Sequence, residues 1–170
     1  AVGSEPGRGT PFHIYLPAIT EDEKPKDQYA PGESPRSRGE RLMYVDDDES
    51  AGHFVRQALE MLDYDVNVFT HPIEALEHFR TKSYDYDLII TDMGMPRVNG
   101  LELAPRAQKI APGIPIILMS GNAGDMPQST LTNAGIRRVV TKPVSCRDLS
   151  IVVREVLDMH RTNTDEDTDC

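Results

Sequence analysis

Five short, nearly continuous apolar runs alternate along this chain with longer stretches whose apolar residues recur at helical spacing. The runs occupy residues 42–45, 66–69, 88–90, 116–119 and 139–140. Uninterrupted runs of this length are typical of strands that are covered on both faces. Helical spacing marks residues 48–62, 72–80, 100–110, 126–133 and 145–160. This order predicts a doubly wound α/β fold, in which helices cover both faces of a single five-stranded parallel sheet.

The periodic elements lie within residues 40–160, which we expect to form one compact domain. Residues 18–39 are rich in proline, charge and small polar side chains and have no periodic apolar face, so we expect a flexible linker there. Residues 161–170 are predicted to form a solvated acidic tail. No apolar run approaches the roughly 18 residues that a membrane-spanning helix needs, so we expect no direct membrane contact.

Charge and cysteine content narrow the class of protein. The net charge of −10 argues against a nucleic-acid partner, which would need a basic surface. It does not exclude phosphate chemistry, because a bound divalent cation can reverse the local sign of the field. The two cysteines, Cys146 and Cys170, have no metal-binding spacing and indicate a reduced setting. We therefore expect a cytoplasmic location, although a longer parent protein could be anchored in a membrane.

Polar side chains follow four of the five predicted strands. Asp46 and Asp47 come directly after the first strand, and Asp92 follows the third after one further residue, Thr91. Ser120 follows the fourth strand and Lys142 follows the fifth. Because the carboxyl ends of parallel strands meet at one edge of a sheet, we expect these side chains to lie close together.

Carboxylates gathered at one edge repel each other, by roughly 3 kcal/mol for a pair about 5 Å apart at an effective dielectric constant of about 20. A bound cation relieves this repulsion, and oxygen ligands with room for water favour Mg²⁺, with Mn²⁺ as a substitute. Asp47 is the expected main ligand, Asp46 acts directly or through water, and Asp92 adds a third oxygen. The backbone carbonyl of Gly94 would complete the protein's share.

Asp92 is also the expected nucleophile. It is ionised at neutral pH and needs no general base. Its attack on a phosphoryl group would form an acyl phosphate, whose oxygens would be met by the cation, by Lys142 and by the Ser120 hydroxyl or a backbone N–H. Asp48 is instead predicted to cap the following helix.

Four segments together resemble the response-regulator receiver domain. They are VDDDES (45–50), DLIITDMGMPRVNG (87–100), ILMSG (117–121) and VVTKP (139–143). Their order and spacing match the family across residues 40–160, and the MPxxxG pattern after the acceptor aspartate is present at residues 95–100. The resemblance implies a flavodoxin-like sheet with strand order 2-1-3-4-5.

The resemblance also implies roles for the site residues. Asp92 would be phosphorylated by the phosphohistidine of a histidine kinase, next to a Mg²⁺ site at Asp46 and Asp47. Ser120 and Lys142 would be the switch pair, and the Lys142–Pro143 peptide would be cis. The partner would be the dimerisation and phosphotransfer domain of a histidine kinase, or a downstream histidine phosphotransfer protein.

Two positions depart from the usual pattern. The site three residues before the lysine, often an aromatic switch in this family, is Val139 here, so a rotating ring cannot report phosphorylation. Pro105 lies inside the third predicted helix, where it removes a backbone hydrogen bond and predicts a kink unless it lies in the first turns.

Residues 1–17 resemble a different domain. Gly7, Gly9, Thr10 and Phe12, followed by the strand-like residues 13–16, are similar to the end of a histidine-kinase ATP-binding domain. A glycine- and proline-rich turn before a stray strand is the simpler alternative. If the resemblance holds, the chain is the C-terminal part of a hybrid sensor histidine kinase, and its own chemistry is limited to self-phosphorylation and dephosphorylation.

Three rival functions remain open from the sequence. A Mg²⁺-dependent hydrolase with an aspartate nucleophile usually has a second acid two residues later, where this chain has Gly94. A flavin- or nucleotide-binding module would need a glycine- or hydroxyl-rich phosphate loop after the first strand, where this chain has three aspartates. A degenerate receiver could act only as a protein-interaction scaffold.

Overall fold

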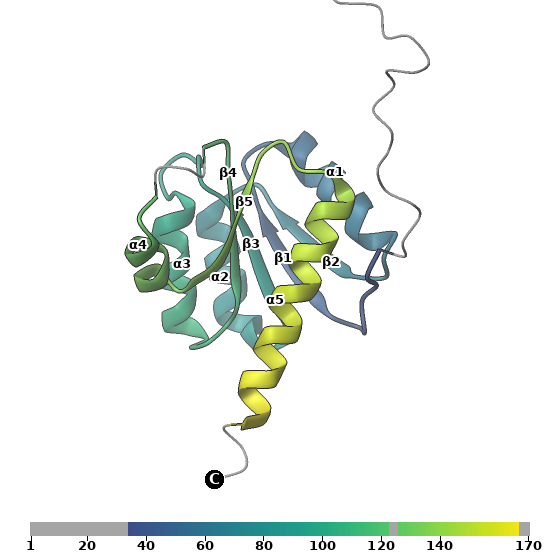
Figure 1. The fold of residues 1–170 in the computed structure, drawn as a ribbon. Helices are drawn as coiled ribbons and strands as arrows, with labels where there is room; N and C mark the ends of the chain where they lie inside the picture. The colour runs from purple at the N-terminus through teal and green to yellow at the C-terminus, as the bar shows by residue number, and fades with distance from the viewer. Residues whose placement is uncertain (1–33, 123–125, 167–170) are drawn as a thin grey trace, which may run out of the picture. The chain divides into compact units, whose positions relative to one another are not determined.

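The computed structural model describes residues 34–122 and 126–166, and these contain one parallel sheet of five strands. The strands are β1 (Arg41–Val45), β2 (Asp65–Phe69), β3 (Leu88–Asp92), β4 (Ile116–Ser120) and β5 (Ile136–Thr141). Their spatial order is β2-β1-β3-β4-β5, and every neighbouring pair is parallel. The predicted doubly wound fold and strand order are therefore confirmed (Figure 1).

Helices cover both faces of this sheet (Figure 1). They are α1 (Glu49–Glu60), α2 (Pro72–Lys82), the short 3₁₀ helix η2 (Ser83–Asp85), α3 (Gly100–Ile110), α4 (Gln128–Ala134) and α5 (Cys146–Glu166). One core cluster joins α2, α3 and α4 to side chains such as Met43 and Val45. The other joins α1 and α5 to their strand neighbours Leu42 and Tyr44. Successive strand residues thus point to opposite faces, which is why the apolar runs are continuous.

Local sequence signals explain how the helices begin and end. The Asp48 side chain accepts hydrogen bonds from the backbone N–H groups of Ser50 and Ala51, so its predicted role as a cap of α1 is confirmed. Asn99 and Glu102 form a reciprocal capping box at the start of α3. After α4, Gly135 adopts a φ of +76°, the left-handed conformation that glycine adopts without strain.

Several boundaries differ from the prediction. Strands β3 and β4 extend to Asp92 and Ser120, so these two residues end the strands. Helix α3 has the predicted bounds, with Pro105 inside it. Helix α5 continues to Glu166, so residues 161–166 are helical where a solvated tail was expected. The extra length is accompanied by an ion pair between Arg161, beyond the expected helix end, and the buried Glu40.

The lead-in to β1 also differs from the expected linker. Within residues 34–39, the Ser37 N–H donates to the Leu62 carbonyl at 2.8 Å, and Arg36 and Arg38 form ion pairs with Asp63 and Asp158. These residues therefore pack on the domain. The predictions for residues 1–17, for the rest of the linker and for the end of the acidic tail fall outside the described residues. None of the helices within residues 34–122 and 126–166 has the length and apolar composition that a bilayer-spanning segment requires.

Candidate functional site

Three carboxylates meet at the carboxyl edge of the sheet. Strand β1 leads into Asp46 and Asp47, and its neighbour β3 ends at Asp92. One carboxylate oxygen from each of the three lies within 4.8 Å of the others. Asp46 and Asp92 are buried, whereas Asp47 is exposed. The cluster therefore offers oxygen ligands on a buried floor with one side open to solvent, which suits a hard divalent cation such as Mg²⁺.

Lys142 reaches this cluster from the end of β5. Its Nζ atom lies 2.8 Å from Asp46 Oδ2 and 2.6 Å from Asp92 Oδ1, so one ammonium bridges two of the three carboxylates. Burial by itself would lower the pKa of Lys142, but the hydrogen bonds to Asp46 and Asp92 outweigh it and raise the pKa above its ordinary value. The lysine is thus charged at neutral pH. The peptide that follows it, Lys142–Pro143, is cis, as the family resemblance implied.

Asp46 has a further partner that the sequence analysis missed. The fully buried Tyr44 donates a hydrogen bond from its hydroxyl to Asp46 Oδ2 at 2.7 Å. The backbone N–H of Asp48 donates to Asp46 Oδ1 at 3.0 Å. Burial, followed by the hydrogen bond to Asp46 and the nearby carboxylate charges, raises the pKa of Tyr44. The sequence does contain a signal for this contact: a tyrosine in a buried strand needs a hydrogen-bond partner for its hydroxyl.

The backbone around Asp92 is held closely on two sides. The Gly94 N–H donates a hydrogen bond to Asp92 Oδ2. The start of α3 packs on the Asp92 backbone, and a Cβ atom at Gly100 would lie 2.5 Å from the Asp92 carbonyl oxygen and 2.5 Å from the Leu118 side chain. Only glycine therefore fits at position 100, which is the physical reason for the last glycine of the MPxxxG pattern.

Ser120 lies on the neighbouring strand, at the same edge, but its hydroxyl is engaged elsewhere. It donates to the Asn122 carbonyl at 3.1 Å and accepts from the Asn122 N–H at 3.2 Å. The backbone of Lys142 is tied to the same strand end, because its N–H donates to the Ser120 carbonyl at 2.8 Å. The structure thus brings Asp46, Asp92 and Lys142 into direct contact, and places Ser120 beside them.

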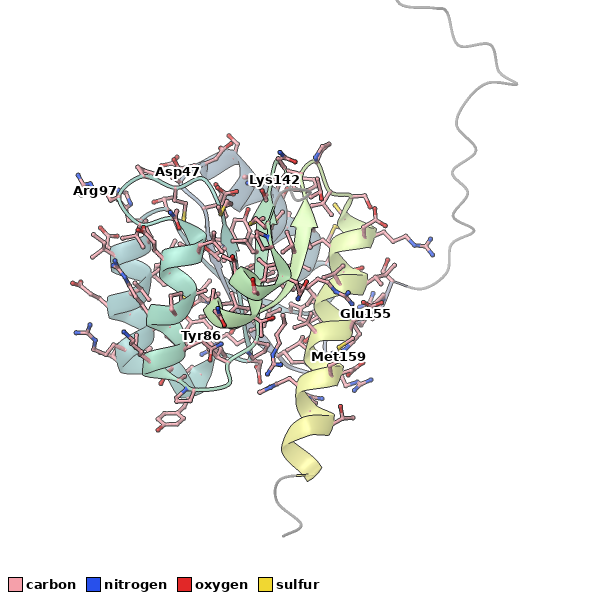
Figure 2. All side chains as sticks on the ribbon, turned by 60° about the vertical axis from the view of Figure 1, so that its left-hand side comes forward. Asp47, Tyr86, Arg97, Lys142, Glu155 and Met159 are labelled. Carbon is pink, nitrogen blue, oxygen red and sulfur yellow. The ribbon has the colours of Figure 1, made fainter. Side chains whose placement is uncertain are left out.

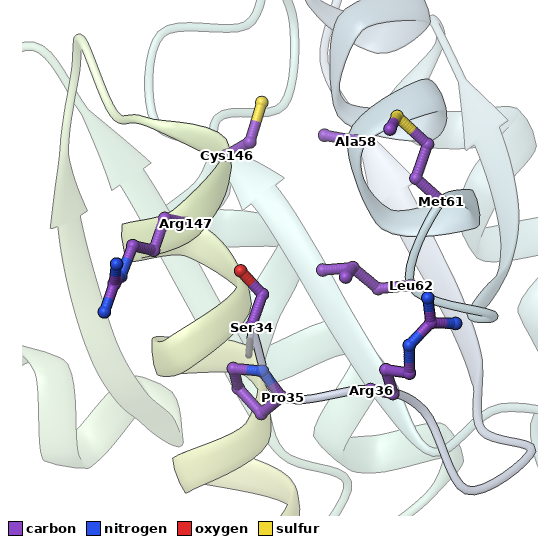
Figure 3. A pocket seen from close by; sticks show the side chains of 8 residues that line it. All are labelled: Ser34, Pro35, Arg36, Ala58, Met61, Leu62, Cys146 and Arg147. Carbon is purple, nitrogen blue, oxygen red and sulfur yellow. The ribbon is translucent and has the colours of Figure 1, made fainter. Parts of the chain in front are cut away.

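Two of the pockets among the described residues differ in their position relative to the acidic site. One, of about 510 Å³, opens beside Asp47 between the loops that follow β1, β2 and β3, and Arg97 lines its far side. Figure 2 shows Asp47, Arg97 and Lys142 at the same end of the domain. A larger pocket, of about 820 Å³, lies between residues 34–36, α1 and the start of α5 (Figure 3). Its lining includes none of the three carboxylates, so it is not part of the acidic site.

Comparison with known proteins settles the family. The sequence profile described as "Response regulator receiver domain" matches residues 42–154, which is most of the chain. The chain belongs to this family. Receiver domains work in two-component signal transduction, and Asp92 with its acidic neighbours lies within the matched residues.

The relatives include both single receiver domains and large sensor proteins. A chemotaxis protein CheY homolog of Campylobacter jejuni is 32% identical over 120 residues, which is 69% of this chain and 92% of that protein. The sensor kinase CckA of Brucella abortus is 28% identical over 164 residues, which is 91% of this chain. The chain spans only 17% of the length of that kinase.

Solved structures agree with the fold. The crystal structure of a CheY-like response regulator receiver domain protein from Methanospirillum hungatei JF-1 has a TM-score of 0.68 and 30% sequence identity, and covers 74% of this chain and 98% of its own. A crystal structure of the receiver domain of the hybrid histidine kinase CckA has a TM-score of 0.59 at 23% identity, which supports the fold alone.

Proposed function

We propose that this domain accepts a phosphoryl group on Asp92 in a two-component signalling pathway. The observation that carries the proposal is the contact set of Lys142, whose single ammonium bridges Asp46 and Asp92 at the end of a receiver-type sheet. A buried carboxylate that keeps one oxygen on a lysine and the other on a backbone N–H is held in one orientation. Fixed orientation and nearby positive charge are the main contributions a protein makes to phosphoryl transfer.

The proposed chemistry is a direct transfer. An oxygen of the Asp92 carboxylate attacks the phosphorus of a donor phosphohistidine, and a new O–P bond forms as the N–P bond breaks. The imidazole leaves with the electron pair of the broken bond and takes up a proton from solvent. During the transfer the Lys142 ammonium moves from the carboxylates to a phosphoryl oxygen, where it neutralises the developing charge. The Ser120 hydroxyl turns from Asn122 toward a second phosphoryl oxygen, and so couples phosphorylation to the loop after β4.

The acidic cluster fits a divalent cation. Asp46, Asp47 and Asp92 supply oxygen atoms only, and the three carboxylates carry two more negative charges than Lys142 can balance. We infer that these three residues and the Gly94 carbonyl hold Mg²⁺, for which Mn²⁺ can substitute. When bound, the cation supplies positive charge to the phosphoryl oxygens. The exposed Asp47 side chain leaves a path by which the cation can enter.

We also propose that the phosphoryl donor or acceptor is a histidine-containing partner within a hybrid kinase system. The alignment with the sensor kinase CckA covers 91% of this chain and so includes residues outside the 42–154 receiver match. An alignment with a kinase that extends beyond the receiver supports a hybrid-kinase origin, in which residues 1–17 would be the end of the ATP-binding domain. The partner would be a histidine-kinase dimerisation and phosphotransfer domain, or a downstream histidine phosphotransfer protein.

The proposal is tested by the intact mass of the protein after incubation with acetyl phosphate, with and without Mg²⁺. We expect the wild type to gain one phosphoryl group only when Mg²⁺ is present, and Asp92→Asn to gain none. Asp48→Asn is the matched control, because asparagine caps a helix as well as aspartate does and should leave phosphorylation intact. No mass gain in the wild type, together with no Mg²⁺ binding, would contradict the proposal and leave an interaction scaffold.

A further inference from the structure

Tyr44 is unusual among the side chains of its core cluster. The residues around it in the cluster under α1 and α5 are mostly aliphatic, and Tyr44 itself is fully buried, one residue before the end of β1. A phenylalanine would fill the same space without a polar atom. Burying a hydroxyl costs about 1 to 3 kcal/mol unless it forms a hydrogen bond. The Tyr44 hydroxyl meets that need at Asp46, a residue of the acidic cluster.

In the proposed chemistry Asp46 must hold the cation and must also release Lys142. Its Oδ2 atom accepts from both Tyr44 and Lys142, at 2.7 and 2.8 Å. When Lys142 moves to the phosphoryl group, Asp46 loses its cationic partner while it remains buried. A buried carboxylate oxygen that loses its donor is strongly disfavoured, so without a second donor Asp46 would hold the lysine back.

We propose that Tyr44 is a positioning residue of the phosphorylation site, an inference that rests on the proposed function. Its hydroxyl keeps a hydrogen bond on Asp46 Oδ2, so the carboxylate stays aligned for the cation while Lys142 is free to leave. The backbone N–H of Asp48 fixes the other oxygen, and the two donors together set the plane of the carboxylate. Outer partners that orient a metal-binding carboxylate in this way typically affect metal affinity by about tenfold or more.

The first test is the Mg²⁺ dissociation constant of Tyr44→Phe, measured calorimetrically on the full chain with the metal alone. We expect binding about tenfold weaker than in the wild type, because the cation must then compete with a lysine that Asp46 holds more tightly. Tyr64→Phe is the matched control, since Tyr64 is buried in the same core cluster and the same atom is removed. It should leave the dissociation constant unchanged.

The second test asks whether Tyr44 acts through Asp46. In an Asp46→Ala background, which removes the acceptor of the Tyr44 hydrogen bond, Tyr44→Phe should no longer change the Mg²⁺ affinity, whereas a general packing defect would add to it.

The third test uses the wild type alone. Mg²⁺ should change the near-ultraviolet circular dichroism of the tyrosines, a signal that is informative because the chain has no tryptophan. The same change should be missing in Tyr44→Phe.

The outcomes separate this inference from the function on which it rests. Normal Mg²⁺ affinity in Tyr44→Phe, or equal weakening in Tyr64→Phe, would overturn the role of Tyr44 and leave the proposed function standing. If Tyr44→Phe does not fold, an unchanged tyrosine spectrum in Mg²⁺-saturated wild type would overturn it instead. A wild type that binds no Mg²⁺ would overturn both.

Discussion

Two clusters of buried charge lie at opposite ends of strand β1. At its carboxyl end, Asp46 and Asp92 share the ammonium group of Lys142, and the exposed Asp47 lies beside them. Before its amino end, Glu40 has two cations of its own, with Arg154 and Arg161 each 2.9 Å from its Oε1 atom. We call these the open cluster and the closed cluster.

In the closed cluster both oxygens of the Glu40 carboxylate have partners, and Arg154 also pairs with Asp158 at 3.0 Å, so two carboxylates face two guanidinium groups. The other oxygen of Glu40 accepts from the Ser37 hydroxyl at 2.8 Å and from the Arg38 N–H at 2.6 Å. Burial of Glu40 opposes its ionisation, but the hydrogen bonds from Arg38, Ser37 and Arg154 outweigh burial and lower its pKa to about 2. These contacts join the lead-in segment, β1 and α5, so the closed cluster stabilises the fold.

The difference between the clusters shows where ligand chemistry can occur. Both contain buried carboxylates, so burial alone does not mark a functional site. The closed cluster has a cation for each carboxylate charge and no need for another, whereas the open cluster has an excess of negative charge beside an exposed aspartate. A surplus of carboxylates that the chain itself does not neutralise is what indicates a cation-binding site.

The largest expected effect comes from removing the cation of the open cluster. Lys142→Ala should slow phosphorylation of Asp92 by about 10²-fold or more, because one donor to the developing phosphoryl charge is lost. Mg²⁺ binding should be retained, since the three carboxylates remain. The rate of phosphorylation by acetyl phosphate checks this, with the exposed Lys109→Ala as control. A wild-type rate in Lys142→Ala would contradict the assigned role.

Breaking the closed cluster should act on stability instead. Arg154→Met removes one of the two guanidinium groups on the buried Glu40 and should lower the free energy of unfolding by about 1 to 3 kcal/mol, as measured by urea denaturation. The double variant Glu40→Met/Arg154→Met should recover most of this loss, because it removes both charges. Mg²⁺ affinity should be unchanged in both variants. A loss of metal binding in a folded Arg154→Met protein would show that the two clusters are not independent.

The pH dependence of stability should sharpen the same contrast. Glu40 is ionised in folded and unfolded chains above its ordinary pKa of 4.5, so its pairing contributes fully there. As the pH falls from 4.5 toward the folded value of about 2, only the unfolded chain takes up the proton, and stability declines. The full loss is on the order of 3 kcal/mol. Denaturation midpoints should therefore converge between wild type and Glu40→Gln as the pH falls, and parallel curves would contradict this assignment.

Metal addition should stabilise the open cluster alone. Mg²⁺ at about 100 times its dissociation constant should raise the free energy of unfolding by about 2.7 kcal/mol. The same increment is expected in Glu40→Gln, because separate sites contribute additively. Removal of the metal with a chelator should reverse it. No Mg²⁺-dependent change in the wild-type thermal midpoint would count against a metal at this edge.

The sequence predicted the open cluster well because local pattern determines it. Each site residue follows a recognisable apolar run, and the ends of parallel strands must meet. The closed cluster was not predicted, because Glu40 and Arg154 are brought together only by the packing of α5 on the sheet. For the same reason the end of α5 was placed too early, since the partner of Arg161 lies far away in the sequence. The hydrogen bond from Tyr44 to Asp46 was not predicted, because a tyrosine within an apolar run has the pattern of an ordinary core residue.

The most direct test of the account is to locate the phosphoryl group on the chain. Borohydride reduces an aspartyl phosphate to homoserine, so phosphorylation in the presence of Mg²⁺, reduction and peptide mass spectrometry identify the residue. We predict homoserine at position 92 in the wild type and at no other aspartate, with none formed when Mg²⁺ is chelated. Homoserine at Asp46 or Asp47, or its formation without Mg²⁺, would contradict the assignment of Asp92 as the acceptor beside a metal-binding carboxylate pair.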